Sequence, residues 1–234
     1  ISYFYTAYNF AAAIAPTVGM YMINLINFTS LFLLCTALSL FSLLFTLRLQ
    51  KTSTQPSATE TVQNSSLRDP KTIHPAVMSF AVHILWGALA AFFPLYAVSQ
   101  GVANPGFFFG AFALTIIVGR ILGGRVLDRY SREKVILPCL IVFIASMILL
   151  SLSKTLPLVI FVAVIYGLGI AFFFPTMVVF TVDRAGAARG PAMGTFTAAS
   201  DLGVGLGAVI MGVVLRLTTY PIMFLCLAFV AAIS

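Results

Sequence analysis

Long apolar runs separated by short polar connections dominate this chain. A run of about 18 or more apolar residues is long enough to cross the hydrocarbon core of a bilayer as a helix. By that criterion seven runs are complete and an eighth is partial. The predicted spans are 3–23, 28–47, 76–98, 107–127, 135–153, 157–182, 191–215 and 219–234.

The composition supports the same class. Hydrophobic residues make up 61% of the chain and charged residues only 8%, and the mean hydropathy is +1.08. A soluble domain cannot bury so many long apolar runs without lipid as solvent. We therefore predict an all-α integral membrane protein. The chain starts at Ile1 without an initiator Met or a signal peptide, and its last run stops at Ser234, so we expect a fragment of a longer protein.

The basic residues predict the orientation, because Lys and Arg are retained on the cytoplasmic side of a membrane. Only Lys154 and Arg216 fall on the opposite side. We therefore expect a multi-pass protein of the cell membrane, with loops 48–75, 128–134 and 183–190 in the cytoplasm. These charges are divided among short loops, which argues against a nucleic-acid partner. The cytoplasmic set is Arg48, Lys51, Arg68, Lys71, Arg125, Arg129, Arg132, Lys134, Arg184 and Arg189.

One long connection, rich in Ser, Thr, Gln and Pro, divides the chain. We expect the last two helices of an N-terminal half at 1–47, a cytoplasmic linker at 48–75, and a six-helix C-terminal half at 76–234. Six spans after a linker are typical of one half of a transporter built from two six-helix repeats.

Few residues in the chain are suited to metal or cofactor chemistry. Cys35, Cys139 and Cys226 are widely spaced inside apolar runs, and His74 and His83 have no partner at ligand spacing. The chain also has no phosphate-binding loop. We expect no metal and no cofactor.

The strongest local motif is GRILGGRVLDRYSREKV, at the end of the fourth predicted span. It resembles the loop motif G-x-x-x-D-R-x-G-R-K/R of the major facilitator superfamily, with Gly124, Asp128, Arg129 and Arg132 in the family's order and Ser131 in place of a glycine. The resemblance implies that fold in partial form, covering helices 5 to 12 and lacking helices 1 to 4. Further resemblance runs through the third and sixth spans.

In this motif Gly124 allows close helix approach, Asp128 is an anion suited to a helix N-terminus, and the arginines can pair with carboxylates or lipid phosphates. Such a group would latch the cytoplasmic side shut, and the resemblance implies a gating role. The alternative is that Arg129 and Arg132 are only positive-inside anchors.

A second motif lies in the first span, which reads AAAIAPTVG. It resembles the family's antiporter motif G-x-x-x-G-P-x-x-G, with Ala11 and Ala15 replacing two glycines before Pro16 and Gly19. The resemblance implies an exporter, although a plain helix-packing face would look similar. An internal repeat sets this span against the seventh and pairs Asn9 with Asp201.

Asp201 is the main candidate for coupling. It lies about 16 Å into a ~30 Å hydrocarbon layer at ~1.5 Å per residue, near the midplane. An unpaired charge there costs upwards of about 2.5 kcal/mol, so the residue is expected to face a transport cavity or to be held by a neighbouring helix. Its predicted face carries small residues, with Phe196 on the far side.

Other cavity or coupling candidates are Arg120, His83 and Tyr166. Arg120 either snorkels or pairs with Asp128, or it attracts an anionic group or neutralises Asp201. His83 and Tyr166 are cavity-lining candidates because the family uses their helices around its cavity.

Together these features predict a secondary active transporter, not an enzyme, that exports a small molecule by proton-coupled alternating access. No second carboxylate, nucleophile pair or metal cluster lies at the depth of Asp201. The predicted partners are the substrate, protons and lipid, and we expect a monomer. Two alternatives are a proton-coupled importer and a non-transporting sensor or assembly protein with this fold.

Overall fold

A computed structural model of the chain describes most residues from Leu25 onward. Contacts divide the chain into two units, Ile1–Gln63 and Asn64–Ser234, and each is described by itself. The side chains of 70–72 and 124–129 lie outside the description. The described residues are 11, 15, 18–19, 21–23, 25–48, 70–102, 104–186 and 188–234.

The first unit contains one described long helix, α2 (Phe28–Arg48), and none of its residues is buried. Its hydroxyl side chains donate to carbonyl oxygens of their own helix, as from Thr36 to Phe32 at 2.8 Å and from Ser39 to Cys35 at 2.8 Å. A helix with internally satisfied polar groups and apolar side chains on all faces suits a lipid environment.

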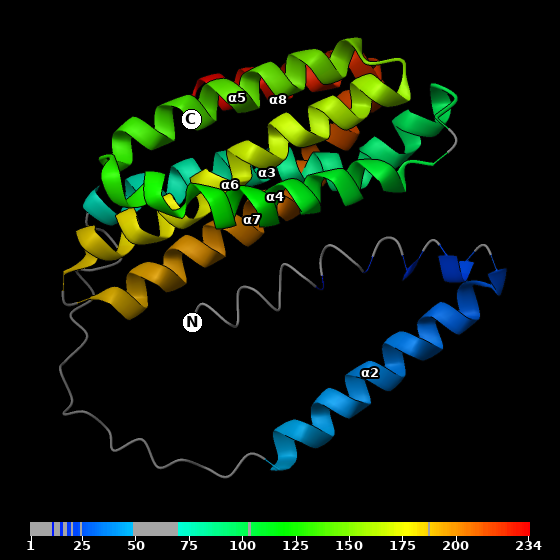
Figure 1. The fold of residues 1–234 in the computed structure, drawn as a ribbon, viewed down its shortest axis with the longest axis horizontal. Helices are drawn as coiled ribbons and strands as arrows, with labels where there is room; N and C mark the ends of the chain where they lie inside the picture. Colours follow the sequence, from blue (N-terminus) through cyan, green and yellow to red (C-terminus); the bar gives the residue numbers. More distant parts are fainter. Residues whose placement is uncertain are drawn as a thin grey trace. The chain divides into compact units, whose positions relative to one another are not determined.

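The second unit is a bundle of long helices joined by short connections (Figure 1). Among the described residues of the chain, six helices are long and apolar enough to cross a membrane, and a shorter one ends the bundle. The predicted all-α membrane fold is confirmed. The helices of this unit are α3 (Pro70–Ser99), α4 (Gly106–Arg129), α5 (Arg132–Leu152), α6 (Leu156–Ala185), α7 (Arg189–Leu217) and α8 (Tyr220–Ala232).

Two boundaries differ from, or lie beyond, the sequence prediction. Helix α3 begins at Pro70, inside the segment 48–75 predicted as linker. Proline suits the start of a helix, where its missing N–H has no intrahelical partner. The predicted first span, 3–23, falls mostly outside the described residues.

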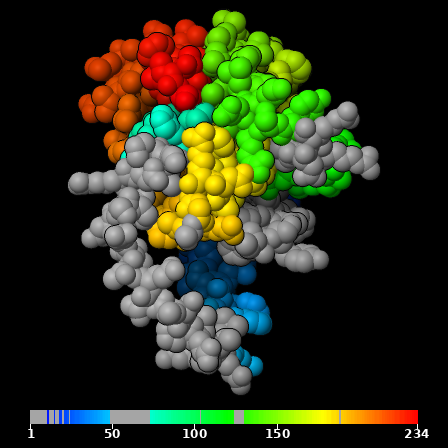
Figure 2. Space-filling model, turned by 90° about the vertical axis from the view of Figure 1, so that its left-hand side faces the viewer, coloured from blue at the N-terminus to red at the C-terminus, as the bar shows by residue number. Residues whose placement is uncertain are grey.

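Helix α6 is the central element of the bundle, since it contacts α3, α4, α5 and α7. Figure 2 views one end of the bundle, where the end of α6 (yellow) lies beside the start of α3 (cyan) and the green helices. At the opposite end, Tyr96 of α3 donates its hydroxyl to the carbonyl oxygen of Ser153, after α5. The ring of Tyr96 also packs 5.5 Å from that of Tyr220 in α8.

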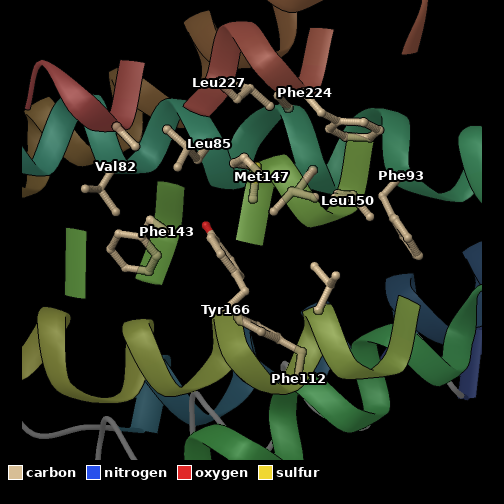
Figure 3. Packing of buried hydrophobic residues seen from close by; sticks show 14 of the residues in the cluster. Val82, Leu85, Phe93, Phe112, Phe143, Met147, Leu150, Tyr166, Phe224 and Leu227 are labelled. Carbon is tan, nitrogen blue, oxygen red and sulfur yellow. The ribbon is translucent and has the colours of Figure 1, made fainter. Parts of the chain in front are cut away.

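Large rings fill the space between α4, α5 and α6. Phe143 is fully buried, and its ring centroid lies 5.3 Å from Tyr166 and 5.5 Å from Phe173. Phe112 stacks on Tyr166 at 5.7 Å. Figure 3 shows Tyr166 pointing from α6 into this apolar layer. We call these four residues the aromatic core.

Helices α3 and α7 meet in a different way, through glycine. A Cβ atom added to Gly87 would collide with the backbone of Val204, and one added to Gly207 would lie 2.5 Å from the carbonyl oxygen of Ile84. Gly203 is equally crowded by the carbonyl oxygen of Phe80. Because glycine has no side chain, the two backbones touch at these positions, as they do at small residues in other membrane helix pairs. We call this contact the glycine seam.

The outer surface of the bundle is apolar. Ile121 is 75% exposed, Leu122 74% and Leu217 80%. Exposed apolar surface on this scale is typical of contact with lipid.

Candidate functional site

A chain of hydrogen bonds crosses the glycine seam. The hydroxyl oxygens of Ser79 on α3 and Ser200 on α7 lie 2.7 Å apart, and both residues are buried. One turn further along α3, His83 Nδ1 lies 2.7 Å from the carbonyl oxygen of Ser79 and 3.2 Å from its hydroxyl oxygen. The two helices are thus joined by a polar cluster that includes an imidazole.

Asp201 follows Ser200 directly and is exposed. No hydrogen bond or ion pair holds its carboxylate within the described part of the chain, but it interacts electrostatically with His83. The buried face of α7 carries Phe196, Ser200 and Gly203. Phe196 therefore faces the bundle, and exposed Asp201 faces away from it. On the small-residue face with Asp201, Gly194 and Gly205 are exposed, whereas Ala208 and Gly212 are half-buried.

Arg120 lies two turns beyond the aromatic core on α4 and is half-buried. Its Nε atom is buried and has no hydrogen-bond partner among the described residues. The structure does not join it to Asp201, and the side chain of Asp128, its other predicted partner, lies outside the description.

Tyr166 lies in the aromatic core and is fully buried. Its hydroxyl has no hydrogen-bond partner among the described residues. Tyr166, which the sequence analysis proposed as a cavity-lining residue, therefore packs among aromatic rings in the structure.

Ion pairs join the start of α5 to the end of α6. Arg132 lies 2.6 Å from Asp183, and a longer pair of 3.8 Å joins Arg184 to Glu133. The guanidinium of Arg184 also lies 4.0 Å above the ring of Phe180. Arg132 thus takes a carboxylate partner, one of the two kinds expected for it.

Several predicted residues lie outside the description. The side chains of Gly124, Asp128 and Arg129 are among them, although α4 continues to Arg129, and so are Asn9 and Pro16. For the antiporter-like motif the described residues are Ala11, Ala15 and Gly19, which are helical.

The sequence analysis did not single out three residues of these clusters. Ser79 and Ser200 are two of many hydroxyls in apolar runs, and only helix contact pairs them. Asp183 precedes Arg184 at the end of a span. An acidic residue in a basic loop is a signal that could have identified it as a partner for an arginine.

The fold defines a multi-pass helical membrane protein in which a partly polar helix pair carries a central carboxylate. Residues 75–234 match the family model of the Major Facilitator Superfamily. Because the match covers most of the chain, the protein belongs to this superfamily, as the loop motif predicted.

Curated proteins with similar sequences support this assignment. The chain is 25% identical over 182 residues to the staphylopine export protein of Staphylococcus aureus, covering 75% of this chain and 45% of that protein. It is 30% identical over 152 residues to an uncharacterized MFS-type transporter of Pseudomonas aeruginosa, covering 64% of this chain and 38% of that one. The chain thus spans less than half the length of these relatives.

Proposed function

We propose that this chain is part of a transporter that exports a small molecule in exchange for protons, with Asp201 as the proton carrier. The observation that carries the proposal is an exposed carboxylate in the middle of an apolar helix, without a hydrogen bond or ion pair in the described residues.

The physical reason lies in the depth of Asp201. It follows the start of α7 by about 18 Å at ~1.5 Å per residue. A charge at that depth is costly, so a carboxylate there needs water, a cation or a proton beside it. A group that is charged on one side of the cycle and neutral on the other can carry a proton in alternating access.

The ion pair between Arg132 and Asp183 serves as a latch in this proposal. It joins two helices of the same unit at the end that carries most of the basic residues, which the positive-inside rule assigns to the cytoplasm. While the pair is formed, it favours movement of α5 and α6 together when this end of the bundle opens.

Two features support the direction of transport. The staphylopine export protein is named as an exporter, and the first span resembles the antiporter motif. Both favour export over import, and the family favours a transporter over an enzyme.

The test uses the full-length protein in everted membrane vesicles with an acidic lumen. Vesicles are incubated with a small-molecule cell extract, and separately with staphylopine as a defined probe, and retained compounds are measured by mass spectrometry. We expect retention of at least one compound that a protonophore abolishes.

In Asp201→Asn, retention should fall on the order of tenfold or more, because the proton-transferring group is lost. Glu60→Gln, in the predicted linker, should retain normal activity. Normal retention in Asp201→Asn contradicts the proton role. Retention only with an alkaline lumen indicates an importer, and absence of any flux favours the non-transporting alternative.

A further inference from the structure

The hydrogen bonds of the glycine seam have a fixed direction. The hydroxyl of Ser200 donates to the carbonyl oxygen of Phe196 at 2.8 Å, because a carbonyl oxygen only accepts. Its single hydrogen is thereby used. The bond of 2.7 Å between the two hydroxyls must then be donated by Ser79 and accepted by Ser200.

This direction determines the tautomer of His83. The hydrogen of Ser79 is directed at Ser200, so the Ser79 hydroxyl offers only lone pairs to the imidazole. The carbonyl oxygen of Ser79 also only accepts, at 2.7 Å from Nδ1. Both contacts therefore require a hydrogen on Nδ1. In the neutral ring the free lone pair is then on Nε2.

We infer that His83 is a second proton-binding group of the Asp201 site, that it takes the proton at Nε2, and that Ser79 and Ser200 are positioning residues that hold it in this form. The inference rests on the proposed function and deepens it. It stands on the direction of the hydrogen bonds and on the tight contact of α3 with α7, which puts His83 next to the Ser79–Ser200 pair, with Asp201 the residue after Ser200.

Among the described residues of α6, α7 and α8, Asp201 is the charged group next to the serine pair. On α7, Ser200 bonds the hydroxyl of Ser79 beside His83, and Asp201 is the next residue. From α6, the ring of Phe174 lies with its centroid 6.2 Å from that of His83. The only tyrosine of α8, Tyr220, packs on Tyr96 at the far end of α3. The charged groups of α6, Asp183 and Arg184, lie at its end, in the ion pairs with the start of α5.

The glycine seam also fixes the ring in place. A Cβ atom on Gly203 would lie 3.0 Å from the Cβ of His83, so α7 passes directly over the base of the histidine side chain. This contact packs the Cβ atom of His83, and the bond to Ser79 orients its ring.

The proposed step moves one proton. The O–H bond of protonated Asp201 breaks, an N–H bond forms at Nε2 of His83, and a carboxylate and an imidazolium result with no change in total charge. Because no hydrogen bond joins the two side chains in the described residues, the proton passes through water. The opposite charges stabilise each other.

Nitrogen-15 NMR of the histidine-labelled full-length protein in lipid tests the tautomer directly, and His83→Gln assigns the signal by its loss. At high pH we expect hydrogen on Nδ1 and none on Nε2. Between about pH 5 and 8 Nε2 should gain a proton, since that range brackets histidine titration. A dominant Nε2–H tautomer, or no protonation across the range, overturns the inference.

Two variants test the positioning and the coupling. Ser200→Ala frees the hydrogen of Ser79 to compete with the carbonyl oxygen of Ser79 for Nδ1, so a measurable fraction of the neutral ring should shift toward the Nε2–H tautomer. Ser146→Ala is the matched control, since that buried hydroxyl bonds only the carbonyl oxygen of Val142, at 2.7 Å. Asp201→Asn should lower the protonated fraction of His83 at a fixed pH. An unchanged signal in both Ser200→Ala and Asp201→Asn overturns the inference.

Transport separates this inference from the proposed function. In the vesicle assay, His83→Gln should lose retention by about tenfold or more and should lose the limb of the pH profile near histidine titration. His74→Gln, at an exposed position near the start of α3, should keep both. If His83→Gln matches His74→Gln while Asp201→Asn is inactive, His83 has no coupling role and the proposed function stands.

Discussion

The aromatic core and the glycine seam solve the same packing problem in opposite ways. In the aromatic core, rings from α4, α5 and α6 fill the space, and the one polar atom of Tyr166 has no partner among the described residues. In the glycine seam the backbones touch, and each buried hydroxyl is bonded. The rings of the aromatic core offer no polar partner to the Tyr166 hydroxyl among the described residues, whereas the small residues of the glycine seam bring polar groups within hydrogen-bond distance.

The largest expected effect comes from emptying the aromatic core. Phe143→Ala removes a fully buried ring with two ring partners and should lower the free energy of unfolding by about 3 kcal/mol through the cavity left behind. Phe161→Ala, at a 52% exposed ring, is the control and should cost much less. Thermal unfolding of the full-length protein in detergent measures both. Equal losses would mean that the core is not close-packed.

Filling the glycine seam should cost somewhat less. In Gly203→Ala the new methyl group meets the carbonyl oxygen of Phe80 and the Cβ of His83, so the helices must separate, at about 1 to 3 kcal/mol. Gly205→Ala is the matched control on the same helix, because nothing lies within 4 Å of its added Cβ. The control should be neutral or slightly stabilised by better helix propensity. Equal melting temperatures for the two variants would contradict direct backbone contact.

Two buried tyrosine hydroxyls, one without and one with a hydrogen-bond partner in the described residues, should respond to removal in opposite ways. Tyr166→Phe removes a buried hydroxyl without a partner in the described residues and should stabilise the protein by about 1 kcal/mol. Tyr96→Phe removes one that donates to the carbonyl oxygens of Ser153 and Leu150 and should destabilise it by about as much. The opposite signs are the result to look for in thermal unfolding. A loss in Tyr166→Phe would reveal a partner for that hydroxyl.

The latch should give the smallest effect on stability. Arg132 and Asp183 have side chains 38% and 54% exposed, so solvent screens their attraction. A double-mutant cycle with Arg132→Ala and Asp183→Ala should give a coupling energy of about 0.2 to 1 kcal/mol that decreases in high salt. A coupling of zero at low salt would remove the structural support for the latch.

Most of the fold was predictable because the bilayer imposes a length and a polarity on each span. Runs such as 135–153 and 191–215 match α5 and α7 closely, since lipid contact requires apolar side chains whatever the neighbouring helix is. The start of α3 was not predictable in this way. It extends back to Pro70 beyond the apolar run, where hydropathy carries no information.

The candidate site was predictable only in its rare residues. Asp201 and His83 stand out because charged and ionisable groups are costly in a membrane. Ser79 and Ser200 do not stand out, since a serine in a helix can always bond its own backbone. The sequence also left open whether the Asp201 face of α7 packs on a helix or lines a cavity, because both faces of that helix carry small residues and only the partner helix distinguishes them.

The sequence by itself determined the class, the spans and the superfamily, because these depend on local hydropathy and on short motifs that act within one helix or loop. Only the tertiary structure decided which helices touch. That contact aligns Ser79 with Ser200, directs their two hydrogens and requires a hydrogen on Nδ1 of His83. Hydrogen-bond direction depends on atoms 121 positions apart in the chain, which no local pattern encodes.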